Sequence, residues 1–377
     1  MRAPATPAVA GPRPSQARPV QARSYQERTV PFATADGRRG NVIQVRGPRA
    51  PTRGTVLLVH GAGVRANIFR APTAVNVVDY LVAAGFDVWL ENWRASIDLP
   101  RCEWTLDAAA AFDHPAAVRT VARESGADEI AAVVHCQGST SFVMAAAAGL
   151  LPQVSTVVSN AVSLHPVVPR VSRAKLDVLI PAVARLTPYL NPQWGLRPPT
   201  ALARWLTAVV RLTHRECDNI VCRWASFTYG TGFPVLWRHE NLDDATHAWL
   251  SGEFADVPLS FFRQMARCVR AGHLLAVDGL AALPANPVAR APRTDARFTF
   301  VAGRLNCCFL PESQERTAGW FDRHAPGRHA LHVFDGYSHL DVFMGKDAAR
   351  DTFPTIARAL DPRALAPAAT PAPARPA

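Results

Sequence analysis

The chain has 377 residues, 49% of them hydrophobic, which is enough for one large core with an inserted subdomain. The formal net charge is +11, but the basic residues are scattered, without the run of about five to eight that marks a nucleic-acid patch. We therefore expect no nucleic-acid partner. A weaker hypothesis is that the positive charge favours an anionic lipid surface or acyl-CoA.

The seven cysteines are an odd number and lack the even framework of a small secreted domain. The N-terminal residues contain no apolar segment typical of a signal peptide, and no uninterrupted apolar run reaches membrane-spanning length. Both features favour a reducing cytoplasm, where thiols stay reduced. The oligomeric state is left open.

Strands and helices are predicted to alternate between two Pro- and Ala-rich tails, residues 1–25 and 363–377, which we expect to be disordered. The first core segment, 26–163, is predicted from apolar runs and from the Gly, Asp and Pro residues that punctuate them. Its expected elements are strands at 28–34 and 41–45 around an Asp36-Gly37 hairpin, a strand at 55–60, a helix at 75–84 closed by Gly85, a strand at 86–90, a helix at 115–124 capped by Asp113 and closed by Gly126, and strands at 130–135 and 154–162.

The alternation is interrupted by a Pro-punctuated, Trp-rich segment at 164–294, whose best predicted helices span 202–212 and 261–275. It resumes at 295–362 with strands at 297–302 and 330–334 and helices at 312–324 and 348–360. This order predicts an α/β fold, a mostly parallel central sheet with helices on both faces. The segment 164–294 is then a helical cap inserted over the carboxyl edge of the sheet, where ligands bind.

Cys136 is the most informative residue, because it stands where an apolar strand gives way to a helix of small residues in His135-Cys136-Gln137-Gly138. Enzymes that hold a nucleophile on such a strand-to-helix turn usually carry Ser there. A thiolate at a helix N-terminus is stabilised by backbone N–H groups and the helix dipole. The position therefore predicts acyl transfer through a thioester, and the alternative is an inert buried thiol.

An oxyanion hole is predicted from the loop His60-Gly61-Ala62-Gly63, which follows the third strand. In this arrangement one backbone N–H comes from that loop and one from the residue after the nucleophile, so Ala62 and Gln137 are the expected donors. The stretch Gly61 to Ala66 also fits a short dinucleotide-binding pattern, but Pro72 delays the helix that such a site needs. We expect no cofactor.

A general base is predicted at His339, in a loop that follows the last strand and comes after the nucleophile in the chain. The residue that orients it is expected three positions after Gly303, where an acid is usual and Asn306 stands instead. Cys, His and Asn form a workable triad because a thiol is more acidic than a hydroxyl. A turn-capping role for Asn306 is equally open, and the rival orienting residues are Asp335, Asp341 and Glu312.

These residues resemble the acid lipase family of α/β-hydrolases, which includes the gastric and lysosomal lipases. The resemblance covers the core, about half of the chain, but not the cap, and it rests on His60-Gly61 and on the stretches 84–90, 113–116, 135–140 and 338–343. It implies the α/β-hydrolase fold, a lipophilic ester or thioester substrate, Cys136 as nucleophile and His339 as base.

Three departures from that family put ordinary lipase activity in doubt: Cys136 for Ser, Asn306 for the acid, and Val134 for a small residue two positions before the nucleophile. A Cys at this turn is similar to polyhydroxyalkanoate synthases, which are acyltransferases, and the Trp93-Arg94 pair after the fourth strand adds slightly to that likeness. The chain is also similar to the hydrolase-like region of some bacterial cholesterol-oxidase-type flavoproteins. The alternatives to a hydrolase are thus an acyltransferase of the synthase type and a degenerate homologue that binds lipid without turnover.

Other chemistry-bearing residues have simpler expected roles. His214, Cys217, Cys222 and the Cys307-Cys308 pair match no structural zinc spacing, so we expect packing and no metal. Arg65, Arg94 and Arg304 could meet a carboxylate or phosphate, but solvation at the surface is the default. Five cap tryptophans are predicted to form a core or to line an acyl pocket: Trp194, Trp205, Trp224, Trp237 and Trp249.

Overall fold

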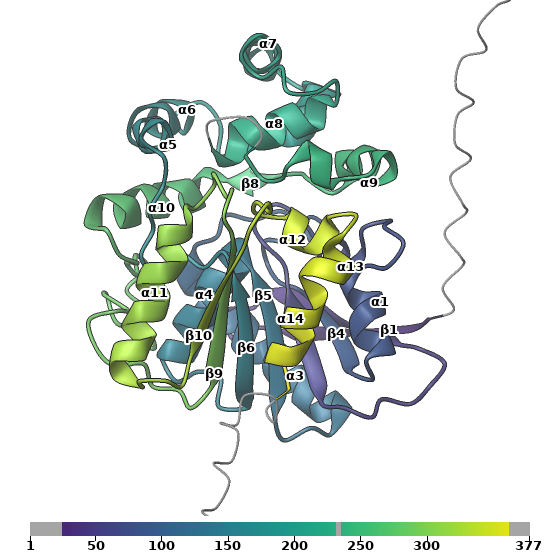
Figure 1. The fold of residues 1–377 in the computed structure, drawn as a ribbon. Coiled ribbons are helices and arrows are strands. Elements are labelled where there is room, and N and C mark those ends of the chain that lie inside the picture. Colours follow the sequence, from purple (N-terminus) through teal and green to yellow (C-terminus); the bar gives the residue numbers. More distant parts are fainter. Residues whose placement is uncertain (1–24, 231–234, 362–377) are drawn as a thin grey trace, which may run out of the picture.

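The computed structural model of the protein describes residues 25–230 and 235–361, so most of the first expected tail and all of the second lie outside the described residues. Within these ranges eight strands form one sheet in the order β1-β2-β4-β3-β5-β6-β9-β10 (Figure 1). The hairpin β1–β2 is antiparallel, β2 is antiparallel to β4, and the strands from β4 to β10 are parallel. The strands are β1 (Gln26–Ala33), β2 (Arg39–Arg46), β3 (Thr55–Val59), β4 (Asp87–Asn92), β5 (Ile130–His135), β6 (Val154–Asn160), β9 (Arg297–Gly303) and β10 (Ala330–Phe334).

Helices cover both faces of the sheet, which explains why central strands such as β3 are mostly apolar and buried at every residue. In Figure 1, α14 lies in front of the sheet, and α3 and α4 lie behind it. The core helices are α1 (Val77–Ala83), α2 (Leu106–Ala108), α3 (His114–Ser125), α4 (Cys136–Ala147), α11 (Pro311–His324), α12 (Asp341–Met344), α13 (Ala348–Asp351) and α14 (Phe353–Ala359), with the 3₁₀ helix η1 (Ala66–Arg70) and the π-helical turn η2 (Ala109–Asp113).

Several predicted boundaries are wrong for local reasons. Strand β6 ends at Asn160, because Ala161 adopts a left-handed φ of 56°. The expected last helix is divided at Thr352, because Pro354 in the first turn of α14 has no N–H group to continue the hydrogen bonds of the preceding helix. Asp113 does not cap α3, since its carboxylate accepts from Arg94 instead. Gly126 ends α3 with a φ of 70°, as expected.

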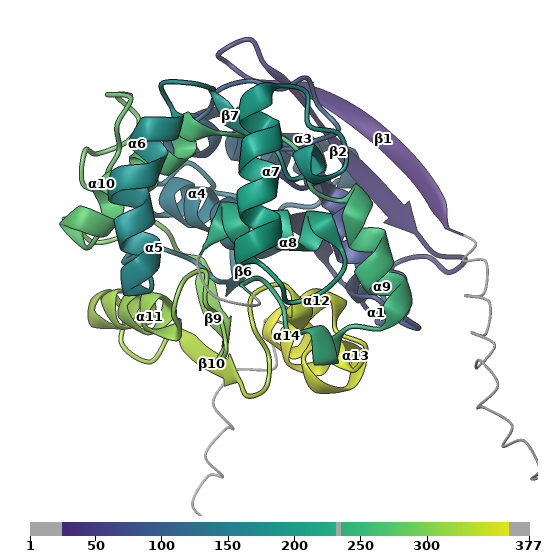
Figure 2. The same ribbon diagram turned by 90° about the horizontal axis from the view of Figure 1, so that it is seen from above.

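The cap lies above the carboxyl ends of the parallel strands, with α7 and α8 over the centre of the sheet when seen from above (Figure 2). It is mainly helical, as the sequence predicts. Its elements are α5 (Arg170–Ala174), the π-helical turn η3 (Lys175–Leu179), α6 (Ile180–Val183), β7 (Tyr189–Leu190), η4 (Pro192–Gly195), α7 (Ala201–Thr213), α8 (Ile220–Tyr229), η5 (His239–Asn241), α9 (Asp244–Trp249), η6 (Leu250–Gly252), β8 (Val257–Pro258) and α10 (Leu259–Ala271), which ends at Gly272 rather than at residue 275.

The tryptophans of the cap form its core. Trp194 packs edge-on against Trp224 at a ring distance of 5.8 Å, and Trp224 and Trp237 are fully buried. Trp205 is the exception, with 60% of its surface exposed on α7. In the described part of the chain, no helix combines the length and apolarity required to cross a membrane.

Candidate active site

Cys136 occupies a strained turn between β5 and α4. Its φ is 55°, a left-handed value that is rare for residues other than glycine. The turn also brings α4 close to the loop after β3, since a Cβ on Gly138 would lie 2.1 Å from the carbonyl oxygen of His60. Val134 is fully buried in β5 without preventing the turn. The backbone therefore has the geometry expected of a nucleophile elbow.

Two backbone N–H groups are directed at the sulfur of Cys136, those of Gln137 and Ala62. These are the two donors predicted from the sequence. Burial raises the pKa of the Cys136 thiol to about 12, and the two N–H groups only partly oppose this effect. The resting thiol is therefore protonated at neutral pH, while the polar groups around it are arranged to receive negative charge.

His339 and Asn306 lie next to this turn. Cys136, His135 and His339 each offer a ligand-type atom within 4.8 Å of the others. The Asn306 amide nitrogen lies 3.1 Å from Nδ1 of His339. Its oxygen accepts N–H groups from Cys308 at 2.9 Å and from Phe309 at 3.3 Å, which determines how the amide is turned. Asn306 therefore caps this turn and also contacts His339.

This orientation settles which nitrogen of His339 carries the proton. Because the Asn306 amide donates to Nδ1, that nitrogen is an acceptor and the neutral ring carries its proton on Nε2. Nε2 is buried and has no hydrogen-bond partner among the described residues. Burial lowers the pKa of His339 to about 3, so the ring is uncharged at neutral pH. Cys136 and His339 are thus a neutral pair in the resting site.

The three rival acids do not contact His339. Asp341 is buried, but its oxygens accept from the backbone N–H groups of Ser338 and Arg238 and from the Asn241 amide. Asp335 is paired with Arg304 at the surface. Glu312 is exposed at the start of α11. Among the candidates considered, Asn306 alone reaches the imidazole.

Sequence reasoning missed a second imidazole and a second asparagine at this site. The ring of His135 lies 4.7 Å from that of His339. Asn160, at the end of β6, donates its amide to Nδ1 of His135 at 2.9 Å and to the carbonyl oxygen of His339 at 3.1 Å. Their positions in the sequence could have indicated both residues. His135 and Asn160 each end a parallel strand at the carboxyl edge of the sheet, where open α/β sheets bind ligands.

A mostly apolar cavity leads to Cys136, with an empty volume of about 570 Å³. Gln137, Lys175, Tyr229 and Cys308 lie in its wall with Cys136. Phenylalanine and aliphatic side chains, and none of the cap tryptophans, make up the apolar part of that wall: Val168, Leu176, Ile180, Phe261, Phe262, Met265, Val269 and Phe309. A lipophilic chain fits such a lining better than a polar substrate does.

Two cap residues in this cavity were not predicted. The Tyr229 hydroxyl donates to the carbonyl oxygen of Ala62 at 2.9 Å, so the cap holds the loop that supplies an oxyanion donor. The Lys175 amine donates to the Gly230 carbonyl at 3.1 Å and faces the Phe227 ring. Burial lowers the pKa of Lys175 to about 7. Lys175 could have been singled out from the sequence because lysine is rare in this chain, where only two of the 41 Lys and Arg residues are lysines.

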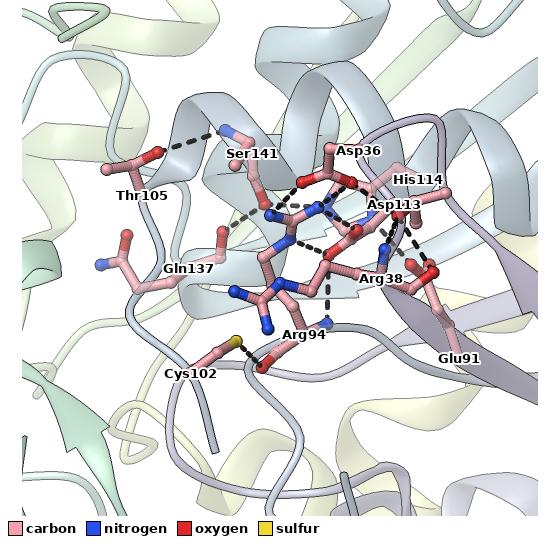
Figure 3. A network of polar contacts seen from close by, with 12 residues as sticks. Asp36, Arg38, Glu91, Arg94, Cys102, Thr105, Asp113, His114, Gln137 and Ser141 are labelled. Carbon is pink, nitrogen blue, oxygen red and sulfur yellow. Dashed lines mark hydrogen bonds and ion pairs between the residues drawn. The ribbon is translucent and has the colours of Figure 1, made fainter. Parts of the chain in front are cut away.

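A network of polar contacts reaches Gln137, the residue after Cys136 (Figure 3). His114 contacts Glu91 at 2.9 Å and the Ser141 hydroxyl at 2.7 Å, and Ser141 donates to the carbonyl of Gln137. Glu91 and His114 are fully buried. The chain of contacts therefore ends on the residue that follows the nucleophile.

Solvation at the surface, the default expectation for the three arginines, is wrong for Arg94, whereas Arg304 is exposed as expected and Arg65 is partly exposed. Arg94 is buried and makes paired contacts with Asp113 and Asp36, the second part of the network in Figure 3. Arg65 pairs with Glu253 and Asp98, and Arg304 pairs with Asp335. Each meets a carboxylate of the protein itself.

The dinucleotide pattern at Gly61 to Ala66 leads into the short helix η1, and its first glycine packs against the nucleophile. A Cβ on Gly61 would lie 2.9 Å from Cβ of Cys136. For metals, the residues described contain two groupings of ligand-type side chains, the trio at Cys136 and a quartet in the cap made of Cys217, Cys222, His239 and His247.

Neither protein-family models nor curated protein sequences gave a significant match to this chain. Solved structures do resemble it. A monoglyceride lipase variant from Saccharomyces cerevisiae aligns with a TM-score of 0.56 at 15% identity, covering 93% of this chain and 98% of that one. A monoacylglycerol lipase from Paleococcus ferrophilus gives 0.53 at 15% identity, covering 89% and 98%. An epoxide hydrolase from Vigna radiata gives 0.51 at 15% identity, covering 89% and 96%.

These neighbours carry out different reactions on one architecture, so at this identity the likeness concerns the fold alone. The sheet order, the strand-to-helix turn at Cys136 and the cap above the carboxyl edge are all consistent with it. The chain has the α/β-hydrolase fold.

Proposed function

We propose that the protein transfers an acyl group from a lipophilic ester or thioester through Cys136. The observation that carries this proposal is the position of the Cys136 sulfur, on a left-handed turn beside an apolar cavity, with the Ala62 and Gln137 N–H groups directed at it. Backbone donors placed in this way stabilise the oxyanion of a tetrahedral intermediate. The esterase and lipase neighbours carry the same fold and are compatible with the proposal.

The proposed reaction has two half-steps. The thiol proton of Cys136 passes to Nε2 of His339 as the sulfur attacks the substrate carbonyl, and the oxyanion is held by the Ala62 and Gln137 N–H groups. Collapse of the intermediate expels the alcohol or thiol, which takes that proton, and leaves a thioester on Cys136. Water, or another acceptor as in the acyltransferases with a Cys at this turn, then attacks the thioester and releases the acyl group.

Proton transfer to Nε2 requires His339 to hold its own proton on Nδ1 instead. The Asn306 amide must then turn its oxygen toward the ring and release the N–H groups of Cys308 and Phe309. Substrate in the cavity beside Cys308 and Phe309 is well placed to favour this change. In the absence of substrate the Cys136 thiol is therefore expected to be unreactive. We expect substrate binding to activate it.

The direct experiment exposes the full chain to p-nitrophenyl esters and acyl-CoAs of increasing chain length and looks for an acyl adduct by mass spectrometry. We expect the adduct on Cys136, lost in Cys136→Ala and kept in the matched control Cys308→Ala, which removes another thiol from the same cavity. An absent adduct across the panel, with any turnover unchanged in Cys136→Ala, contradicts the proposal.

The cap supports a lipid surface as the source of the substrate. Helix α7 lies at the top of the cap, farthest from the sheet (Figure 1). One of its faces exposes Arg204, Trp205, Arg211 and Leu212, at positions that helical periodicity places together. Arg side chains beside exposed apolar ones are typical of segments that bind anionic membranes. We propose that this face contacts an anionic lipid surface.

A second candidate is a homologue that binds a lipophilic ligand without turnover. The observation that favours it is the Asn306 amide, which places a donor where other enzymes of this fold place a carboxylate. Iodoacetamide alkylation of Cys136 followed against pH, with and without a bound ester, separates the two candidates. A binding protein keeps the slow reaction of a thiol of raised pKa and forms no acyl adduct, whereas the proposed enzyme acylates well below pH 8.

A further inference from the structure

Four metal-ligand side chains converge in the cap, away from Cys136. Cys217 lies in the loop after α7, Cys222 in the first turn of α8, His239 at the start of η5 and His247 in α9. One ligand atom of each lies within 4.8 Å of all the others. The Cys222 sulfur is 3.3 Å from Nε2 of His239, and the rings of His239 and His247 are 4.9 Å apart.

The backbone around these side chains is held by other contacts. The Asn219 oxygen accepts the N–H groups of Val221 and Cys222, which begins α8 and orients Cys222. Its amide donates to the carbonyl of His247 at 3.0 Å and to the Ser251 hydroxyl at 2.9 Å. One side chain thus joins the two segments that carry Cys222 and His247. Two of the four ligands, Cys222 and His247, are therefore positioned by contacts of the protein itself.

The polar atoms of the quartet are incompletely satisfied by the protein. Nε2 of His247 is buried without a hydrogen-bond partner in the described chain. Leaving a buried imidazole nitrogen without a partner costs free energy, whereas a cation at the centre of the quartet would be bound by that nitrogen and by the other three ligand atoms.

We propose that Cys217, Cys222, His239 and His247 bind one Zn²⁺ ion in tetrahedral geometry. Two thiolates and two neutral imidazoles balance the charge of the ion and are the usual ligands of structural zinc. Four protein ligands leave no open position, so the site is structural rather than catalytic. The proposal does not depend on acyl transfer at Cys136.

The sequence spacing concealed this site. Four residues separate the two cysteines, which is within the range of structural zinc sites, but seven separate His239 from His247. The longer gap arises because the two histidines lie on different elements, η5 and α9, rather than on one helix. His214 and Cys307-Cys308, which the sequence analysis grouped with these cysteines, do not belong to the quartet.

A bound ion would connect the cap to the cavity. It would hold the N-terminus of α8 to the segments that carry His239 and His247. The other end of α8 carries Tyr229, which contacts Ala62 in the oxyanion loop and lines the cavity. Loss of the ion is therefore expected to loosen the cap helix that covers Cys136.

The test uses the full chain, purified under reducing conditions without a chelator. We expect elemental analysis to find about one Zn²⁺ per chain, as for four-ligand structural sites. Replacing it with Co²⁺ should produce the visible absorption of a tetrahedral ion and a sulfur-to-cobalt charge-transfer band. His247→Cys keeps four ligands and should retain Co²⁺ with a stronger charge-transfer band. This variant tests the site without removing a ligand, so its result cannot arise from misfolding caused by metal loss.

Cys217→Ser should lose the metal, and the matched control Cys307→Ser, which changes a half-buried cysteine outside the quartet, should retain it. The proposal is overturned if the reduced wild-type chain binds neither Zn²⁺ nor Co²⁺ at one equivalent. It is also overturned if native protein contains a Cys217–Cys222 disulfide, or if His247→Cys leaves the cobalt spectrum unchanged.

Discussion

Asn306 donates its side-chain amide to Nδ1 of His339 at 3.1 Å, while its oxygen is occupied by two backbone N–H groups. In the usual triad a carboxylate accepts a hydrogen bond from the N–H group at this nitrogen and stabilises the imidazolium. Here the hydrogen bond runs in the opposite direction. The imidazole is consequently held neutral, with its proton on the nitrogen that would have to receive the thiol proton.

Asn306→Asp is therefore expected to increase the rate of Cys136 acylation. One carboxylate oxygen can keep accepting the N–H groups of Cys308 and Phe309, and the other can accept a hydrogen bond from the Nδ1–H group of His339. General-base catalysis contributes about 10²- to 10⁴-fold, so we expect a gain of about tenfold or more. The carboxylate also raises the pKa of His339, which should move the acid limb of the pH–rate profile to higher pH.

The control for this gain is Asn76→Asp, at the N-cap of α1, where Asp caps as well as Asn does. Rates are measured by mass spectrometry of the acyl adduct and by release of p-nitrophenol. A folded Asn306→Asp protein that acylates no faster than wild type, with an unshifted acid limb, would show that His339 is not the base.

Gly138→Ala is expected to disrupt the turn that carries Cys136. The new Cβ would lie 2.1 Å from the His60 carbonyl oxygen, a backbone atom that cannot move without displacing the oxyanion loop. Overpacking of this kind typically costs about 1–3 kcal/mol of folding free energy, which urea unfolding can measure. Gly252→Ala is the control, since nothing lies within 4 Å of its added Cβ. Equal unfolding free energies for the two variants would contradict the close approach of α4 to the loop.

The arrangement of the core could be predicted because it depends on local patterns. The apolar run before Cys136 and the small residues after it indicate a strand-to-helix turn, and the structure places that turn at Cys136 with a φ of 55°. The order of Cys136, Asn306 and His339 along the chain was likewise enough to predict that they lie near one another.

The details that decide reactivity depend on contacts between distant segments. The direction of the Asn306 amide follows from the N–H groups of Cys308 and Phe309, whose orientation no periodicity reveals. The quartet of Cys217, Cys222, His239 and His247 comes from four separate segments, so its spacing matches no local motif. Lys175 enters the cavity only because the cap folds over the sheet.

Stability is expected to fall as the pH drops below about 6.5. Burial lowers the pKa of His60 and His339 to about 3, so the folded protein leaves both rings neutral where the unfolded chain binds protons. Between these pH values each ring removes about 1.4 kcal/mol of stability per pH unit. Asp341 acts oppositely between pH 3.8 and about 6, because burial raises its pKa to about 6.

His60→Phe tests this prediction. The ring of His60 stacks on Trp93, which Phe can also do. Its Nε2 has no partner among the described residues, so the polar contact that Phe removes is that of Nδ1 with the Gly61 carbonyl oxygen at 2.7 Å. We expect the slope of unfolding free energy against pH to decrease by about 1.4 kcal/mol per pH unit, measured by urea unfolding. His332→Phe, on the exposed edge strand β10, should keep the wild-type slope. Parallel curves for wild type and His60→Phe would mean that His60 is protonated in the folded state.

The exposed face of α7 is expected to bind anionic vesicles. Trp205 and Leu212 are 60% and 66% exposed, and Arg204 and Arg211 lie beside them. Each Arg near an anionic surface contributes about 1 kcal/mol, so changing both to Gln should weaken binding about 30-fold. Sedimentation with phosphatidylglycerol vesicles measures this loss, and added salt should reduce wild-type binding toward that of the double variant.

Trp205→Ser separates the apolar contribution from the electrostatic one, because it leaves both arginines in place. Its loss of binding should persist at high salt, since burial of apolar surface is not screened. Leu331→Ser is the matched control, an exposed apolar residue on β10 of the core. If Leu331→Ser weakens binding as much as Trp205→Ser does, or if wild type prefers neutral phosphatidylcholine vesicles, the α7 face is not the lipid contact and the substrate must reach the cavity by another route.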